Sequence, residues 1–309
     1  MSLAVRLPCD EASIRAGRVD PRCESAGRWV LAAAILGSSL SFIDGTVVTV
    51  ALPAIGRELG GAGADLQWVV ESYTLFLAAL LLVGGSLADL FGRRRIYSLG
   101  VILFTAASIA CGSASTMTWL ITARALQGVG AALLVPGSLA LISASFDQSH
   151  RGRAIGTWSG FSGITAAIGP LLGGWLVNHS WRWAFFLNVP IAVLVLVLLT
   201  RVPESRNRDV RGVDVPGAAL ASLGLGGIVF ALIESPRRGG ADPAVLAGFG
   251  AGLTALAMFL LVEARSKSPM LPLSLFRSRT FAGTNVLTLF LYGALSAVFF
   301  FLPLNLIQV

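Results

Sequence analysis

Asp44 is the residue whose type and place in the chain most clearly offer chemistry. It interrupts an apolar stretch, where an ionisable side chain costs about 2.5–3.5 kcal/mol on membrane-insertion scales. Gly37, Ser41 and Gly45 repeat every four residues beside it and form a stripe where another helix can approach closely. A carboxyl group held there can bind and release a proton, so Asp44 is a candidate proton carrier. The alternative is a structural carboxylate that is hydrogen-bonded between helices.

Arg124 is a second charge inside an apolar stretch, and Gln127 follows it on the same face of a helix. Because arginine does not lose its charge in proteins, Arg124 needs a carboxylate or a cluster of carbonyl groups nearby. It could instead extend to the membrane interface, which is close to its end of the helix. Glu71 and Tyr73, one turn into another apolar stretch, are candidates with Gln127 for the wall of a substrate cavity. Glu71 could equally be a first-turn carboxylate that the helix dipole favours.

The composition determines which elements must position these residues. Hydrophobic residues make up 55% of the 309-residue chain and charged residues 13%, with a mean hydropathy of +0.78. A soluble domain carries roughly 25% charged residues, so a water-soluble enzyme and a disordered chain are both excluded. A membrane helix needs about 20 mostly apolar residues. The sequence predicts about nine such spans, at residues 29–50, 66–88, 96–113, 118–143, 154–177, 183–200, 215–233, 244–262 and 281–307.

The positive charge indicates an orientation for these spans. Most of the 23 Lys and Arg residues fall in alternate loops, including Arg93, Arg94 and Arg95. Such loops stay in the cytoplasm, so the sequence predicts a multi-pass protein of the inner (plasma) membrane with a cytoplasmic N-terminus. The bias also accounts for the net charge of +7 and the pI near 10.3 without a nucleic-acid partner.

Residues 84–95 form a glycine-rich, arginine-rich loop between two spans. Gly92 is a natural helix stop, and the arginines suit a helix C-terminus, but neither fact explains Asp89. Together Gly85, Asp89, Gly92 and Arg93 resemble the G-x-L-x-D-x-x-G-R-[KR]-[KR] signature of the major facilitator superfamily.

Four further segments strengthen this resemblance. Residues 124–132 look like the superfamily's R-x-x-Q-G-x-G-A-A motif of helix 4. Gly169, Pro170, Gly173 and Gly174 resemble the antiporter motif of helix 5, with Thr165 as a mild departure. Residues 44–53 and 181–190 look like motifs of the fourteen-helix drug:proton antiporters, the multidrug efflux permeases.

The resemblance implies an all-α major facilitator fold. Its parts would be a cytoplasmic tail at residues 1–28 and a six-helix bundle at 29–200. A loop with two extra helices at 201–264, and a loop with the first helix of a second bundle at 265–309, would follow. It implies proton-coupled efflux, by antiport, of amphipathic or cationic drugs and toxic small molecules. The implied roles are proton coupling for Asp44 and Arg124, a conformational latch for Gly85, Asp89, Gly92 and Arg93, and neither a cofactor nor a metal.

The length does not fit the complete fourteen-helix plan, because five helices would be missing. The sequence therefore predicts a partial chain that lacks most of the second bundle and does not transport alone. Its expected partners are protons, a small-molecule substrate, the lipid bilayer and, for a split transporter, a second chain. An intact mass well above 32.2 kDa for the protein extracted from its own membranes would identify a longer chain.

Other functions make different predictions. A proton-coupled solute symporter of the same superfamily would import metabolites rather than export dyes, although the glycine-proline motif counts against it. A non-transporting half or scaffold would have no need of Asp44 and Arg124. An enzyme is not indicated, because His150 and His179 fall in loops on opposite sides and residues 84–95 lack the Gly-Lys-Ser/Thr ending of a phosphate loop.

Overall fold

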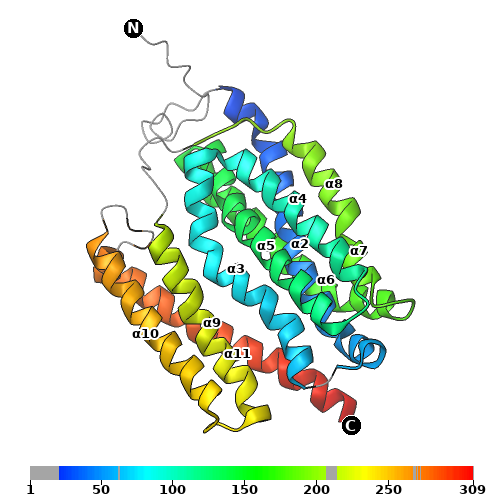
Figure 1. Cartoon of the computed structure of the whole chain (residues 1–309). Helices are drawn as coiled ribbons and strands as arrows, with labels where there is room; N and C mark the ends of the chain where they lie inside the picture. The colour runs from blue at the N-terminus through cyan, green and yellow to red at the C-terminus, as the bar shows by residue number, and fades with distance from the viewer. Residues whose placement is uncertain are drawn as a thin grey trace.

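The structure, a computed structural model, describes residues 21–61, 63–206, 214–266, 269, 271 and 273–308, with side chains between residues 26 and 294. These residues form helices joined by short turns, and no strand occurs among them (Figure 1). The elements are α2 (Pro21–Leu59), α3 (Ala64–Phe91), α4 (Arg93–Gly112), α5 (Met117–Ser145), α6 (Gln148–Val177), α7 (Trp183–Phe186), α8 (Asn188–Leu199), α9 (Val215–Arg238), α10 (Pro243–Arg265), η1 (Leu273–Arg277) and α11 (Arg279–Gln308).

Seven helices of the described chain are long and apolar enough to cross a membrane, namely α2 to α6, α9 and α10. The predicted fold class, an all-α polytopic membrane protein, is confirmed. The expected span at 183–200 differs in detail, because it is divided into α7 and α8 at Leu187. Pro190 lies in the first turn of α8, where its missing N–H costs no helical hydrogen bond.

The core lies among α2 to α8, with α5 at its centre. α5 packs against α2, α3 and α4, while α6 lies along α2 and α8 closes the bundle against α2 and α4 (Figure 1). α9 packs against α3, and α10 packs against α9. The described side chains of α11 are exposed beyond its first turn, so this helix adds little to the core. The division of the chain at residues 28, 200 and 264 stays a prediction.

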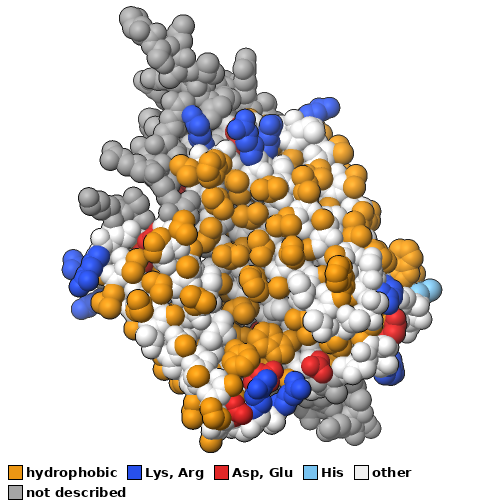
Figure 2. Space-filling view, in the orientation of Figure 1, with side chains coloured by type: hydrophobic (Ala, Val, Ile, Leu, Met, Phe, Trp, Pro, Cys, Tyr) orange, Lys and Arg blue, Asp and Glu red, His pale blue; other side chains and the backbone are white. Residues whose placement is uncertain are grey.

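The outer surface is apolar over a broad band. Figure 2 shows hydrophobic side chains across the middle of the visible face, with Lys and Arg at its edges. Large apolar side chains such as Leu171 and Leu289 are 77% and 71% exposed. A water-soluble monomer does not present such a surface, whereas lipid chains cover it at no cost. The protein is therefore a multi-pass membrane protein.

One end of this bundle is rich in arginine. The start of α2, the α3–α4 turn, the α5–α6 turn and the end of α8 lie together there. We call it the arginine-rich end, and it carries Arg28, Arg93, Arg94, Arg95, Arg151, Arg153 and Arg201.

Gly84 allows α3 to cross α5 closely, because a Cβ there would overlap the carbonyl oxygen of Ala132. We expect Gly84→Ala to destabilise the bundle by about 1–3 kcal/mol through overpacking. Gly156 on α6 is the matched control, since a Cβ at this position meets nothing within 4 Å. Gly156→Ala should be as stable as the parent or more stable by up to about 1 kcal/mol, because alanine favours a helix interior over glycine. Unfolding in detergent measures both variants, and equal stability of the two would contradict the close crossing.

Candidate functional site

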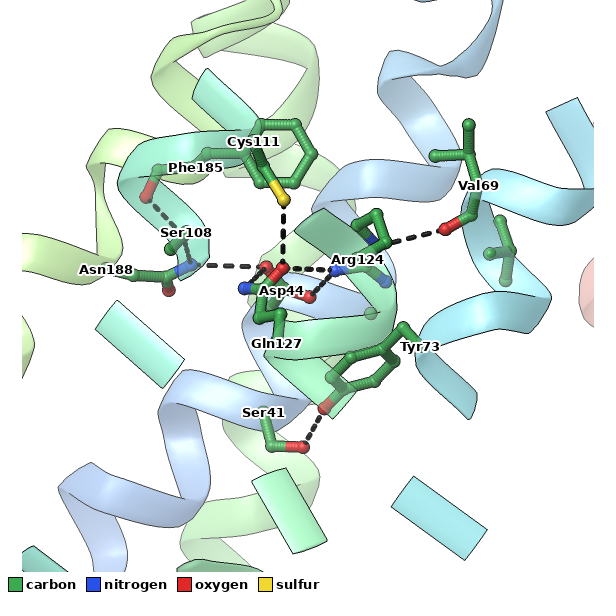
Figure 3. Close-up of polar contacts among 12 residues, drawn as sticks. Ser41, Asp44, Val69, Tyr73, Ser108, Cys111, Arg124, Gln127, Phe185 and Asn188 are labelled. Carbon is green, nitrogen blue, oxygen red and sulfur yellow. Dashed lines mark hydrogen bonds and ion pairs between the residues drawn. The ribbon is translucent and has the colours of Figure 1, made fainter. Parts of the chain in front are cut away.

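A closed triangle of polar side chains lies in the centre of the bundle (Figure 3). Arg124 Nη1 donates to Asp44 Oδ2 at 2.5 Å and to Gln127 Oε1 at 2.8 Å, and Gln127 Nε2 donates to Asp44 Oδ1 at 2.7 Å. Asp44 and Gln127 are 0% exposed and Arg124 is 1% exposed. The sequence indicated a helical face shared by Arg124 and Gln127. The structure brings Asp44 of α2 onto that face, and Arg124 does not reach the interface.

Asn188 extends this triangle toward α4. Its Nδ2 donates to Asp44 Oδ1 at 3.2 Å and to Ser108 Oγ at 2.9 Å, and Ser108 in turn donates to the carbonyl of Phe185 at 2.9 Å. Cys111 Sγ lies 3.6 Å from Gln127 Oε1. The carboxylate of Asp44 is therefore bonded by one guanidinium and two amides from α5 and α8.

The sequence did not single out Asn188, Ser108 or Cys111 as site residues. The sequence does contain a feature that could have identified Asn188 as a site residue. It is a polar residue within the segment at 181–190 that resembles an antiporter motif. No feature of the sequence distinguishes Ser108, because a serine in an apolar helix usually forms a hydrogen bond with its own backbone.

Tyr73 and Val69 of α3 close the other side of Arg124. Arg124 Nε donates to the Val69 carbonyl at 3.0 Å, and the guanidinium carbon lies 4.3 Å from the centre of the Tyr73 ring. The Tyr73 hydroxyl is hydrogen-bonded to Ser41. Tyr73 and Gln127, both expected to line a substrate cavity, are thus buried around the charge pair in this conformation.

Glu71 lies apart from this network. Its side chain is half-buried, and no hydrogen bond or ion pair to it occurs among the described residues. The neighbouring Trp68 instead donates to Glu234 of α9 at 3.1 Å, and Glu234 pairs with Arg238 at 2.8 Å. Of the three cavity candidates, only Glu71 is accessible here.

The α3–α4 loop contains a second cluster of charges. Arg93 binds Asp89 one turn earlier, with Nε at 2.9 Å and Nη2 at 2.8 Å from Oδ1. Gly92 ends α3 and begins α4 with φ of 113°, a backbone region that favours glycine. Gly85, one turn before Asp89, is half-buried on α3 and faces the side chain of Pro136 on α5.

Glu204, which the sequence did not single out, holds this loop from the segment after α8. Its carboxylate accepts from the backbone amides of Arg94 at 3.0 Å and Arg95 at 3.2 Å, at the N-terminus of α4 where the helix dipole favours a negative charge. A Cβ on Gly92 would lie 2.8 Å from this carboxylate. The resemblance implied a conformational latch at this loop, and the structure adds its contact with the segment after α8.

The glycine-proline segment of α6 divides between two faces. Gly169 and Gly173 are buried against α2, where Cβ atoms would meet Thr46 and, at 3.3 Å, Val47. Pro170 is exposed, and Gly174 is half-buried beside open space. Two glycines of this motif therefore serve the packing of α6 on α2.

Outside the spans, Asp147 and His150 mark the start of α6. The Asp147 side chain accepts from the His150 amide at 2.8 Å and caps the helix. This hydrogen bond, with those from the His150 and Ser149 side chains, holds the pKa of Asp147 below its usual value. His179 lies at the other end of α6, and both histidines are exposed. No group of three or more potential metal-ligating side chains occurs in the described part of the chain.

A bundle of membrane-spanning helices around a buried charge pair defines a polytopic membrane protein with an internal polar site. Residues 34–308 match the Major Facilitator Superfamily, and the chain belongs to that family. It is 42% identical over 250 residues to the multidrug resistance protein Stp of Mycobacterium tuberculosis (strain ATCC 25618 / H37Rv), covering 80% of this chain and 47% of that protein. It is 37% identical over 296 residues to the methylenomycin A resistance protein of Bacillus subtilis (strain 168), covering 94% and 63% of the two chains.

Solved structures support the fold. The chain superposes on a peptide transporter POT in complex with sulfate with a TM-score of 0.56 and 19% identity, covering 78% of this chain and 53% of that chain. It also matches a bacterial homolog of the human lysosomal transporter Spinster in an inward-facing, unoccupied conformation, with a TM-score of 0.51, 24% identity, and coverage of 78% and 63%. The chain spans about half the length of most curated relatives it matches, for example 47% of Stp and 51% of the puromycin resistance protein pur8 of Streptomyces alboniger.

Proposed function

We propose that the chain belongs to a secondary active transporter that exports amphipathic or cationic small molecules in exchange for protons. The observation that carries the proposal is the ion pair between Asp44 and Arg124, buried where membrane helices usually have no charge. Family membership and relatives named for multidrug and antibiotic resistance support the same class of activity.

The polar triangle supports a proton-coupling role for Asp44. A proton on this carboxylate removes the negative charge that compensates Arg124, which keeps its own charge. The hydrogen bonds from Gln127 and Asn188 lose a charged acceptor at the same time. Binding a proton therefore changes the contacts among α2, α5 and α8, and such a local change can bias two packings of the helices. Because the charge of Arg124 is fixed, protonation of Asp44 has a large effect on these contacts.

The α3–α4 loop is proposed as the latch of this conformational cycle. Asp89, Arg93 and Glu204 tie the ends of α3, α4 and α8 into one rigid group. Gly92 permits both the sharp turn and the close approach of the carboxylate. A rocking bundle needs rigid groups of this kind at its rim.

The substrate wall is proposed to include Glu71 together with the network residues Tyr73 and Gln127. Glu71 is the accessible acid and suits a cationic group, and the rings of Phe42 and Phe76 on α2 and α3 are 38% and 39% exposed. Tyr73 and Gln127 would contact substrate when the network around Arg124 opens.

The protein is proposed to lie in the inner membrane with its arginine-rich end facing the cytoplasm, because positively charged loops stay on the cytoplasmic side. Single cysteines test this orientation in a background without Cys9, Cys23 and Cys111. In intact cells, a membrane-impermeant thiol reagent should label Arg57→Cys and leave Arg153→Cys unlabelled, since both positions are exposed at opposite ends. The reverse pattern would invert the assignment.

Reconstituted vesicles test the function itself. The full protein carrying this chain, in proteoliposomes with an imposed pH gradient, should move a lipophilic cationic dye against its concentration as protons move the other way. A matched vesicle without the gradient is the control. Uptake of a metabolite in the same direction as protons, with no dye movement, would identify a symporter instead.

A further inference from the structure

A basic pocket opens at the arginine-rich end of the bundle, away from the Asp44 network. Its volume is about 460 Å³, and it lies between the start of α2, the start of α4 and the segment after α8. Arg28, Trp29, Arg94 and Arg201 line it, and none of its described lining residues is a carboxylate.

The described residues compensate the charges in this pocket only in part. The guanidinium carbons of Arg28 and Arg201 lie 5.2 and 5.8 Å from the centre of the same Trp29 ring, so one indole ring contacts two like charges of the pocket. Neither arginine has a carboxylate partner among the described residues. Arg94 is oriented by a hydrogen bond from Nη1 to the Val202 carbonyl at 2.9 Å. Its Nε also lies 4.0 Å from Glu204, whose carboxylate accepts in addition from the backbone amides of the α4 N-terminus. An anion among the three arginines would relieve their repulsion.

The surroundings indicate a ligand that is charged at one end and apolar at the other. The Trp29 ring is half-buried at the boundary between the apolar band and the charged edge, the level at which tryptophan is enriched in membrane proteins. Below the pocket, Val193 and Val197 lie on one face of α8 and are 57% and 58% exposed. An acyl chain can follow this face into the bilayer.

We propose that the pocket binds the phosphate group of an anionic phospholipid, with the guanidinium groups of Arg28, Arg94 and Arg201 around the phosphate and an acyl chain along α8. Arginine suits this role, because its planar fork matches phosphate oxygens and it stacks on aromatic rings. The site is independent of transport and of the Asp44 pair. A lipid held there would bridge α2, α4 and α8 at the same end as the latch.

Native mass spectrometry of the delipidated protein in detergent tests the proposal. The first equivalent of phosphatidylglycerol should bind more tightly than the first equivalent of phosphatidylcholine. Each of Arg28→Gln and Arg201→Gln should weaken phosphatidylglycerol binding about fivefold, and the double variant about 30-fold. Arg153→Gln is the control, because Arg153 is exposed at the same end and lies outside the pocket.

Control variants exclude misfolding as the cause of lost binding, and a competition experiment distinguishes lipid phosphate from soluble phosphate. The variants Arg28→Lys and Arg201→Lys keep the charge but lose the planar fork, so they should bind phosphatidylglycerol more tightly than the Gln variants and less tightly than the parent, a graded order that a general loss of structure would not give. Unchanged binding of phosphatidylglycerol to the double Gln variant would overturn the site. Displacement of the lipid by an equal concentration of inorganic phosphate would overturn the lipid assignment in favour of a soluble anion.

Discussion

Replacing Asp44 with asparagine is expected to reduce gradient-driven transport to background while the protein still inserts and folds. Asparagine has nearly the same shape and keeps one of the two oxygens, which can accept from either Arg124 or Gln127, but it cannot bind a proton. The charge change that couples protonation to the packing of α2, α5 and α8 is therefore lost. Dye movement and proton movement in vesicles should disappear together.

The matched control for this experiment is Asp65→Asn. Asp65 lies in the first turn of α3 and has no bond to the Asp44 network. The Asp65→Asn protein should transport like the parent. A loss of transport seen only in the Asp44→Asn protein would therefore assign the proton to Asp44. Full coupling in the Asp44→Asn protein would rule out Asp44 as the carrier and direct attention to Glu71.

Removing Arg124 is expected to have the largest effect on stability. Arg124→Leu leaves the carboxylate of Asp44 buried without its cation, and breaking a buried pair in this way costs about 3–5 kcal/mol. The substitution also removes the bond to the Val69 carbonyl and the contact with the Tyr73 ring. Arg124→Lys keeps a charge but cannot reproduce the guanidinium fork, so this variant should be more stable than Arg124→Leu and less stable than the parent.

A double-mutant cycle separates the charge effect from lost packing. Adding Asp44→Asn to Arg124→Leu removes the uncompensated charge, so the double variant should be more stable than Arg124→Leu alone. Arg95→Gln is the control for an exposed pair. Arg95 is 76% exposed and 3.7 Å from Glu204, and its loss should cost less than about 1 kcal/mol. Unfolding in mixed detergent measures the parent, the two single variants, the double variant and the Arg95→Gln control. A double variant no more stable than Arg124→Leu would show that packing, not charge, holds Arg124.

Motifs allowed part of the site to be predicted, but not its geometry. The sequence indicated that Asp44 and Arg124 are anomalous in apolar helices, because charge in a bilayer is costly wherever it occurs, and that Gln127 shares a helical face with Arg124. It could not show that Asn188 and Ser108 join them. These residues are up to 144 positions apart along the chain, and their contact depends on how α2, α4 and α8 pack. Glu204 was missed for a similar reason, since an acid after a helix looks like an ordinary loop residue until the α4 N-terminus is placed against it.

Accessibility was another property that the sequence left open. Tyr73 and Gln127 were expected at a cavity wall, and both are buried around Arg124, while Glu71 two residues before Tyr73 is not. Which polar residue of a helix faces the core depends on the crossing of neighbouring helices. Close approaches at Gly84 and at Gly128, where a Cβ would overlap the Tyr73 carbonyl, determine that crossing for α3 and α5.

The sequence by itself determined that this is a polytopic helical membrane protein and where most of its spans lie, because lipid requires long apolar stretches whose length can be read directly. It also determined the family, because the α3–α4 loop and the helix 4 motif are local patterns. Only the tertiary structure decided that Asp44 pairs with Arg124, that Glu204 binds the N-terminus of α4, and that Arg28 and Arg201 share one tryptophan. Such contacts join distant segments, and their geometry follows from the packing of whole helices rather than from any local preference.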